Sequence, residues 1–197
     1  VTIDGTTHKL APPFLLIATQ NPIDHEGTFP LPEAQLDRFL LKLALGYPTL
    51  DEETQLLDML KSEHPLDKLQ PVLTAEQLVV CQRAVRTVHV DPKIRRYITE
   101  IVHATRGHHD VSLGGSPRAS IALYRTSQAI AAIRGRNFVE PDDVKSIVPA
   151  VLGHRIILRP EARLQNVGVA EILTDILDNV KVPLLESRGA SPATREA

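Results

Sequence analysis

Two polar side chains suited to phosphate chemistry lie near the start of the chain. Asn21 follows the apolar run 14–18, and Arg38 lies between a short helical pattern and a second apolar run at 40–45. A neutral amide just beyond a buried strand can hold a water or a phosphate oxygen, because open α/β sheets bind ligands at that edge. A guanidinium is always charged and suits a phosphate, including one held by a neighbouring subunit. The structural alternative is that Asn21 belongs to a turn and Arg38 to an ordinary surface ion pair.

A third candidate lies downstream, in the segment 113–119 with the sequence LGGSPRA. The two glycines allow a flexible approach, Ser116 can cap a helix, and Pro117 fits the first helical turn. Arg118 then projects from a helix N-terminus, which attracts anions, so that the helix end and the guanidinium together make an anion site. The alternative is an exposed arginine on an ordinary capped helix.

These segments resemble one known family. ATQNP (18–22) and EGTFPLPEAQLDRF (26–39) look like the sensor-1 and arginine-finger segments of the MoxR family of AAA+ ATPases, and GGSPRA resembles the sensor-2 segment of its lid. Magnesium chelatase ATPase subunits share the Asn-Pro and Asp-Arg-Phe elements but lack the PLPEAQ connection. The resemblance implies that Asn21 and Arg38 are catalytic: Asn21 would position the attacking water, and Arg38 would be the finger that reaches the next subunit's nucleotide. It also implies that Asn21 and Arg118 contact the bound nucleotide.

The phosphate cradle and the metal-binding carboxylates of that family do not occur in this sequence. There is no Gly-x-x-x-x-Gly-Lys-[Ser/Thr], and no apolar strand ends in paired acidic residues. The resemblance implies ATP and Mg²⁺ as cofactors, a hexameric ring of identical subunits, and chaperone-like remodelling of partners with von Willebrand factor A domains. Because the sequence opens at Val1 without an initiator methionine, we expect it to be the C-terminal part of a MoxR-type ATPase. Without the phosphate cradle, this part is expected to be inactive alone, and we expect the protein to be cytoplasmic.

The hydrophobic pattern predicts an α/β segment followed by an all-α segment. Residues 1–47 are expected to be the C-terminal portion of an AAA+ α/β core, 48–186 a helical lid, and 187–197 a disordered tail. Within the first part, we expect a hairpin turning at Asp4-Gly5, a short helix at 33–39, and strands buried in a sheet at 14–18 and 40–45.

Capping residues mark the expected helices of the second part. Thr49 with Glu52, and Thr74 with Gln77, have capping-box spacing, and proline stands at the first helical position in three further cases. Residues 154–158 could form a short strand that pairs with 138–139. The expected helices start at Thr49, Thr74, Asp91-Pro92, Ser116-Pro117, Pro141 and Val169, with the first burying Leu56, Leu57 and Leu60.

Composition restricts the alternatives. The chain has 197 residues, 43% of them hydrophobic, and 22 basic against 24 acidic side chains, a net charge of −2. This balance argues against nucleic acid as a partner, and so against a DNA-remodelling ATPase; no apolar run is long enough for membrane insertion. A non-enzymatic helical interaction module remains the alternative function.

Other reactive residue types favour structural interpretations. The lone Cys81 lies in an apolar helical pattern and is expected in the core, and the basic residues 155–163 are expected at the solvated surface. The cluster His108-His109-Asp110 has no second ligand pair in the sequence, so a solvated helix end is favoured and no metal site is predicted.

Overall fold

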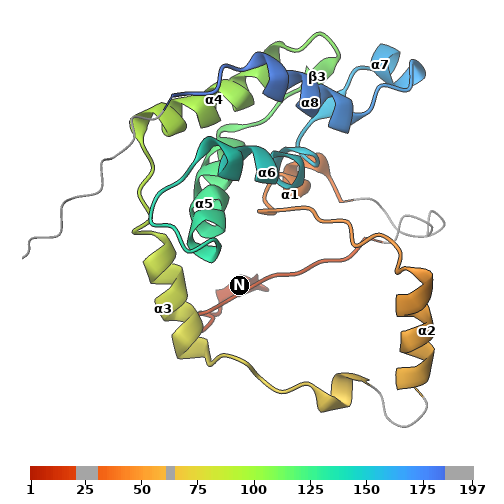
Figure 1. Ribbon diagram of the computed structural model, residues 1–197, viewed down its shortest axis with the longest axis vertical. Coiled ribbons are helices and arrows are strands. Elements are labelled where there is room, and N and C mark those ends of the chain that lie inside the picture. The colour runs from red at the N-terminus through yellow and green to blue at the C-terminus, as the bar shows by residue number, and fades with distance from the viewer. Residues whose placement is uncertain (21–30, 61–64, 185–197) are drawn as a thin grey trace, which may run out of the picture. The chain divides into compact units, whose positions relative to one another are not determined.

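The computed structural model describes residues 1–20, 31–60 and 65–184 of the chain, and these form two compact units. Unit 1 comprises residues 1–31 and 43–87, and unit 2 comprises 32–42 and 88–197, each taken over its described residues. Among the described residues, no helix has the length and apolar character needed to cross a membrane. Figure 1 shows the course of the chain.

Unit 1 begins with the expected hairpin. Strands β1 (Thr2–Ile3) and β2 (Thr6–Thr7) pair antiparallel. The turn residues Asp4 and Gly5 both have positive φ, 48° and 78°, as a tight two-residue hairpin turn requires.

The helices of unit 1 start where the capping boxes predict. Helix α2 (Leu50–Met59) is capped by Thr49 and Glu52, and α3 (Ala75–Val85) by Thr74 and Gln77. A 3₁₀ turn, η1 (Pro65–Lys68), separates them.

Several burial predictions in this part of the chain are wrong. Residues 14–18 and 40–45 form no strand, and Leu15 and Leu45 are 78% and 100% exposed. A sheet strand needs neighbouring strands for its backbone groups, and no described strand pairs with either run. The expected core positions are likewise exposed: Leu56 and Leu57 on α2, Leu60 directly after it, and Cys81 on α3.

Unit 2 contains the hydrophobic core. Helix α4 (Pro92–Gly107), capped by Asp91, buries Ile94, Ile98 and Ile101 on one face, as its period predicts. Helix α5 (Pro117–Ile133) packs against α4 and α6 (Pro141–Leu152), and α8 (Val169–Asn179) packs against α4 and α6 (Figure 1). The shorter helices of the unit are α1 (Glu33–Leu36) and α7 (Pro160–Leu164), the second of which the sequence pattern missed.

The small sheet of unit 2 pairs differently from the prediction. Strand β4 (Ile157–Leu158) pairs antiparallel with β3 (Val111–Leu113), whereas Phe138 makes an isolated bridge with His89. Either segment, 111–113 or 138–139, could supply backbone hydrogen bonds to a short apolar strand, and the sequence alone does not distinguish the two partners.

A buried carboxylate anchors the start of α6. Asp143 is fully buried and accepts hydrogen bonds from Arg134 Nη1 at 2.7 Å, from Arg136 Nη1 and Nη2 at 2.8 and 2.5 Å, and from the backbone N–H of Glu140 at 2.9 Å. Burial by itself raises the pKa of Asp143, but the hydrogen bonds from Arg136 and Glu140 and the charge of Arg136 outweigh it and hold that pKa below its ordinary value.

Candidate functional site

A glycine loop packed on α4 positions Arg118. A Cβ on Gly114 would lie 2.7 Å from the backbone of Thr105 and Arg106, so this position accepts only glycine without a backbone shift. The next peptide is held on both sides: the N–H of Gly115 donates to Thr105 Oγ1 at 2.9 Å, and its carbonyl accepts from Arg106 Nε at 2.7 Å. The direction in which α5 starts is therefore fixed by α4.

Ser116 begins α5 and links it to a distant segment. Its hydroxyl accepts from the N–H of Arg118 at 3.2 Å, which is the expected helix cap. The same hydroxyl donates to the Asp37 carboxylate at 3.0 and 3.1 Å. Asp37 also accepts from Arg118 Nη1 at 3.3 Å, so the residue before Arg38 contacts the segment that carries Arg118.

Arg155 is buried beneath the same segment, and the prediction of a solvated surface residue is wrong for it. Its side chain is 3% exposed, and Nε donates to Asp37 Oδ1 at 3.1 Å. Nη2 donates to the carbonyls of Asp37, at 3.2 Å, and Phe39, while Nη1 donates to those of Leu40, at 3.4 Å, and Val151. Burial lowers the pKa of Arg155, and the Asp37 carboxylate opposes that shift.

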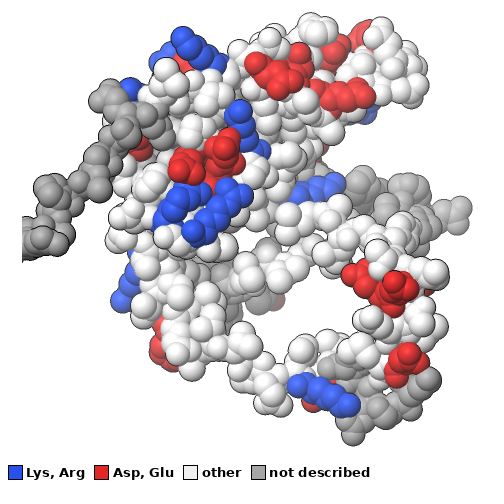
Figure 2. Space-filling model, in the orientation of Figure 1, with Lys and Arg blue, Asp and Glu red and all other residues white. Residues whose placement is uncertain are grey.

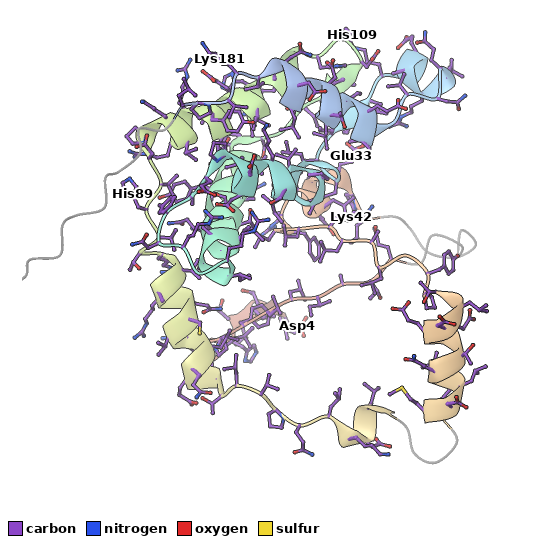
Figure 3. The ribbon with its side chains drawn as sticks, viewed as in Figure 1. Asp4, Glu33, Lys42, His89, His109 and Lys181 are labelled. Atoms are coloured by element: carbon purple, nitrogen blue, oxygen red, sulfur yellow. The ribbon has the colours of Figure 1, made fainter. Side chains whose placement is uncertain are left out.

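His154 holds the same stretch of backbone. Its Nε2 lies 3.3 Å from the carbonyl of Phe39, and burial, followed by the charge of Arg155, lowers its pKa, so this ring is neutral at pH 7 and donates from Nε2. Two residues farther, the N–H of Lys42 donates to the carbonyl of Ala150 at 2.9 Å. Glu33 and Lys42, labelled in Figure 3, lie near the two ends of the segment that these contacts attach to unit 2.

The structure brings Arg38 and Arg118 to one surface hollow of about 370 Å³ within unit 2. Arg38 and Arg125 are exposed and make no ion pair with any described residue, and Arg118 is 62% exposed despite its contact with Asp37. Cations without close counter-charges at a hollow favour an anionic ligand. Asn21, the third predicted site residue, lies outside the described residues. The lining of the hollow is Asp37, Arg38, Leu40, Arg118, Ile121, Ala122, Arg125 and Arg155.

Two residues of this arrangement were missed by sequence reasoning, Asp37 and Arg155. Asp37 directly precedes the predicted arginine finger, Arg38, and this position could have marked it as a site residue. The three residues that donate hydrogen bonds to its carboxylate, however, are far away in the chain. Arg155 directly precedes the apolar residues 156–158, a position where a buried arginine can be suspected but its partners cannot be named.

The histidine cluster at the end of α4 is engaged in protein contacts. His108 Nδ1 accepts from the backbone N–H of Asp110 at 3.2 Å, so its proton lies on Nε2, 3.4 Å from Asp175 Oδ2 on α8. His109 pairs with Asp110 at 3.0 Å and is stacked on His108, and Figure 3 labels its position. The ligand atoms of these three side chains lie within 4.8 Å of one another, close enough to approach one metal ion, and in the structure the side chains contact protein groups.

Charged side chains are mixed on the visible face. Figure 2 shows lysine and arginine side chains interspersed with aspartate and glutamate rather than gathered in one large area. On that face, the charge pattern is that of an ordinary solvated surface.

Comparison with known proteins gives matches over most of the chain. The family description of the ATPase family associated with various cellular activities (AAA) matches residues 1–41, and that of the AAA lid domain matches residues 103–176. The chain is 48% identical over 187 residues to the uncharacterized protein YeaC of Bacillus subtilis, and 36% identical over 192 residues to the chaperone MoxR1 of Mycobacterium tuberculosis. These alignments cover 95% and 93% of the chain, and 58% and 50% of the two relatives.

A solved structure of an ATPase also matches most of the chain. The crystal structure of a candidate ATPase from Cytophaga hutchinsonii matches with a TM-score of 0.86 and 34% sequence identity, over 93% of this chain and 58% of the other. The chain thus spans about half of the length of the relatives it matches. The expected fold class, a partial AAA α/β core followed by a helical lid, is confirmed. The motifs quoted above and these matches agree, and the chain belongs to the MoxR family of AAA+ ATPases.

Proposed function

We propose that this chain supplies the charge-stabilising part of an ATP-hydrolysing site in a MoxR-type ring. In the reaction, a water oxygen bonds to the γ-phosphorus, the bond from that phosphorus to the β–γ bridging oxygen breaks, and ADP and inorganic phosphate leave. Asn21 would orient the water, and Arg38 would stabilise the charge that develops on the transferred group. Arg118 would contact the phosphates and make the position of the lid depend on the nucleotide.

The observation that supports this proposal is that Arg38 and Arg118 line the same surface hollow. Two segments that are 80 residues apart in sequence, and that both resemble phosphate-contacting segments of the same family, line one surface hollow of unit 2. Because both residues line this hollow, we propose that they act on the same triphosphate. The hydrogen bond that Arg118 Nη1 donates to the Asp37 carboxylate orients the arginine without burying it, since that side chain stays 62% exposed.

ATP fits this hollow by its charge, whereas Mg²⁺ does not. Fixed guanidinium groups are suitable donors to phosphate oxygens. Among the described residues, the hollow contains one carboxylate, Asp37, and its oxygens already accept from Ser116, Arg118 and Arg155. We therefore assign no Mg²⁺ ligand to the described part of the chain, and Mg²⁺ remains an implication of the family.

The test is hydrolysis and nucleotide binding by the full-length protein. Arg38→Ala is expected to lower kcat about 10³-fold or more while nucleotide affinity changes little, because a finger acts on charge that develops in the transition state. Arg118→Ala is expected to weaken nucleotide binding. Arg95→Ala, which removes an exposed arginine on α4 that does not line the hollow, is the matched control. Wild-type turnover in Arg38→Ala would contradict the proposal.

The wider setting is also proposed. Residues 1–47 would belong to the α/β nucleotide-binding core and 48–186 to the lid, while 187–197 lie outside the described residues. The ring would be a hexamer of identical subunits in the cytoplasm, and its work would be chaperone-like remodelling of proteins with von Willebrand factor A domains. The name of the Mycobacterium tuberculosis relative, a chaperone, supports this class of activity.

A further inference from the structure

The contacts of Arg155 are concentrated on the segment that carries Arg38. Four of its five acceptors are the Asp37 carboxylate and the carbonyls of Asp37, Phe39 and Leu40. A guanidinium removed from water needs such partners, because a buried donor without an acceptor is strongly unfavourable. Arg155 therefore holds this backbone on both sides of residue 38.

The backbone of Arg38 is held by hydrogen bonds, whereas its side chain is exposed. Its own N–H donates to the carbonyl of Gln35 at 3.1 Å, and the carbonyls on either side of it are bound by Arg155, with His154 also at that of Phe39. Its side chain, in contrast, is exposed at the hollow and makes no ion pair with a described residue. Such an arrangement aims a side chain at a ligand that the surrounding fold does not supply.

We propose that Arg155, assisted by His154, is a positioning residue for Arg38. The inference rests on the proposed function, in which Arg38 stabilises the transferred phosphoryl group. Arg155 does not touch that group: its guanidinium is occupied by the backbone and by Asp37, and it acts by fixing where the Arg38 side chain starts. Displacing a catalytic group by about 1 Å lowers the rate by about 100-fold. Loss of the contacts between Arg155 and residues 37–40 is therefore expected to lower turnover.

Arg155→Lys is the direct test, made in the full-length protein. Lysine keeps the charge opposite Asp37, but one ammonium cannot hold a carboxylate and several carbonyls in the plane of a guanidinium. We expect kcat to fall about 10- to 100-fold with the KM for ATP nearly unchanged. In an Arg38→Ala background, the same substitution is expected to lower kcat by less than about two-fold, because the group that Arg155 positions is then absent.

Arg136→Lys is the matched control. It weakens another arginine–carboxylate contact of unit 2, the one with Asp143, which does not line the hollow. Both lysine variants are expected to lower the thermal unfolding midpoint, but Arg136→Lys is expected to keep the wild-type kcat. If Arg155 served the fold alone, the folded Arg155→Lys protein would also keep the wild-type kcat, or its loss would persist in the Arg38→Ala background; either result overturns the proposal.

His154→Ala covers the case in which Arg155→Lys does not fold. This residue is only partly buried and contributes one contact to the carbonyl of Phe39, so a smaller loss of about three-fold in kcat is expected, again absent in the Arg38→Ala background. A loss that is the same in both backgrounds overturns the proposal. Wild-type turnover in Arg38→Ala itself would instead contradict the proposed function, so the two failures are distinguishable.

Discussion

Replacing Asp143 by asparagine tests the buried ion cluster at the start of α6. Breaking a buried pair removes about 3–5 kcal/mol. Here the loss is smaller, because the asparagine side chain would keep an oxygen for the N–H of Glu140, and because Arg134 and Arg136, 47% and 21% exposed, can regain water. We expect Asp143→Asn to lower the free energy of unfolding by about 2–3 kcal/mol at pH 7, measured by urea titration with circular dichroism.

The pH dependence of this difference follows from the pKa of Asp143. That pKa is lower in the folded chain than its ordinary value of about 3.9, so the carboxylate stabilises the fold fully above about pH 4, and this contribution is lost as the pH falls through the folded-state pKa. The wild type should therefore approach Asp143→Asn in stability below about pH 4. Asp142→Asn, an exposed neighbour in the same helical turn, is the control and should lower stability by less than about 1 kcal/mol. A wild-type advantage that is unchanged at about pH 3, well below the ordinary carboxyl pKa, or an Asp143→Asn protein as stable as Asp142→Asn at pH 7, would refute the reasoning.

Two further substitutions test the loop that positions Arg118. Gly114→Ala should lower the unfolding free energy by about 1–3 kcal/mol, because its Cβ would overlap the backbone of α4, while Gly107→Ala, with open space at its Cβ, should change it by less than about 1 kcal/mol; thermal unfolding compares the two. Ser116→Ala should cost about 1–2 kcal/mol through the lost helix cap and the lost hydrogen bond to Asp37, and Ser116→Thr should recover most of it; equal midpoints for the alanine and threonine variants would contradict the cap assignment.

Local signals predicted the helices of this chain well. The capping boxes at Thr49 and Thr74 and the prolines at the first helical positions depend on residues within one turn, and the structure has each helix start there. The buried face of α4 also follows from its own period. The apolar stripe of α2, in contrast, is exposed, because a helix pattern names a face to be covered but not its partner.

The site was also predictable only in part, because a local pattern does not name the distant residues that it contacts. The identities of Arg38 and Arg118 could be proposed from motifs, each from a stretch of a few residues. The carboxylate that joins them to the buried guanidinium could not, since Asp37 and Arg155 are 118 residues apart and each is ordinary in its own surroundings. The roles of Arg38 and Arg118 as phosphate ligands, like that of Asn21, stay predictions.

The attachment of residues 32–42 to unit 2 has a consequence for motion. The chain passes between the two units at 31/32, 42/43 and 87/88. If unit 2 rotates when nucleotide binds or leaves, the three crossings are the hinges that must absorb the change in backbone angles. Arg38 belongs to unit 2 together with Arg118, although it falls within the proposed core range 1–47, so the two residues would then travel together and the spacing of their backbones would stay constant through the cycle.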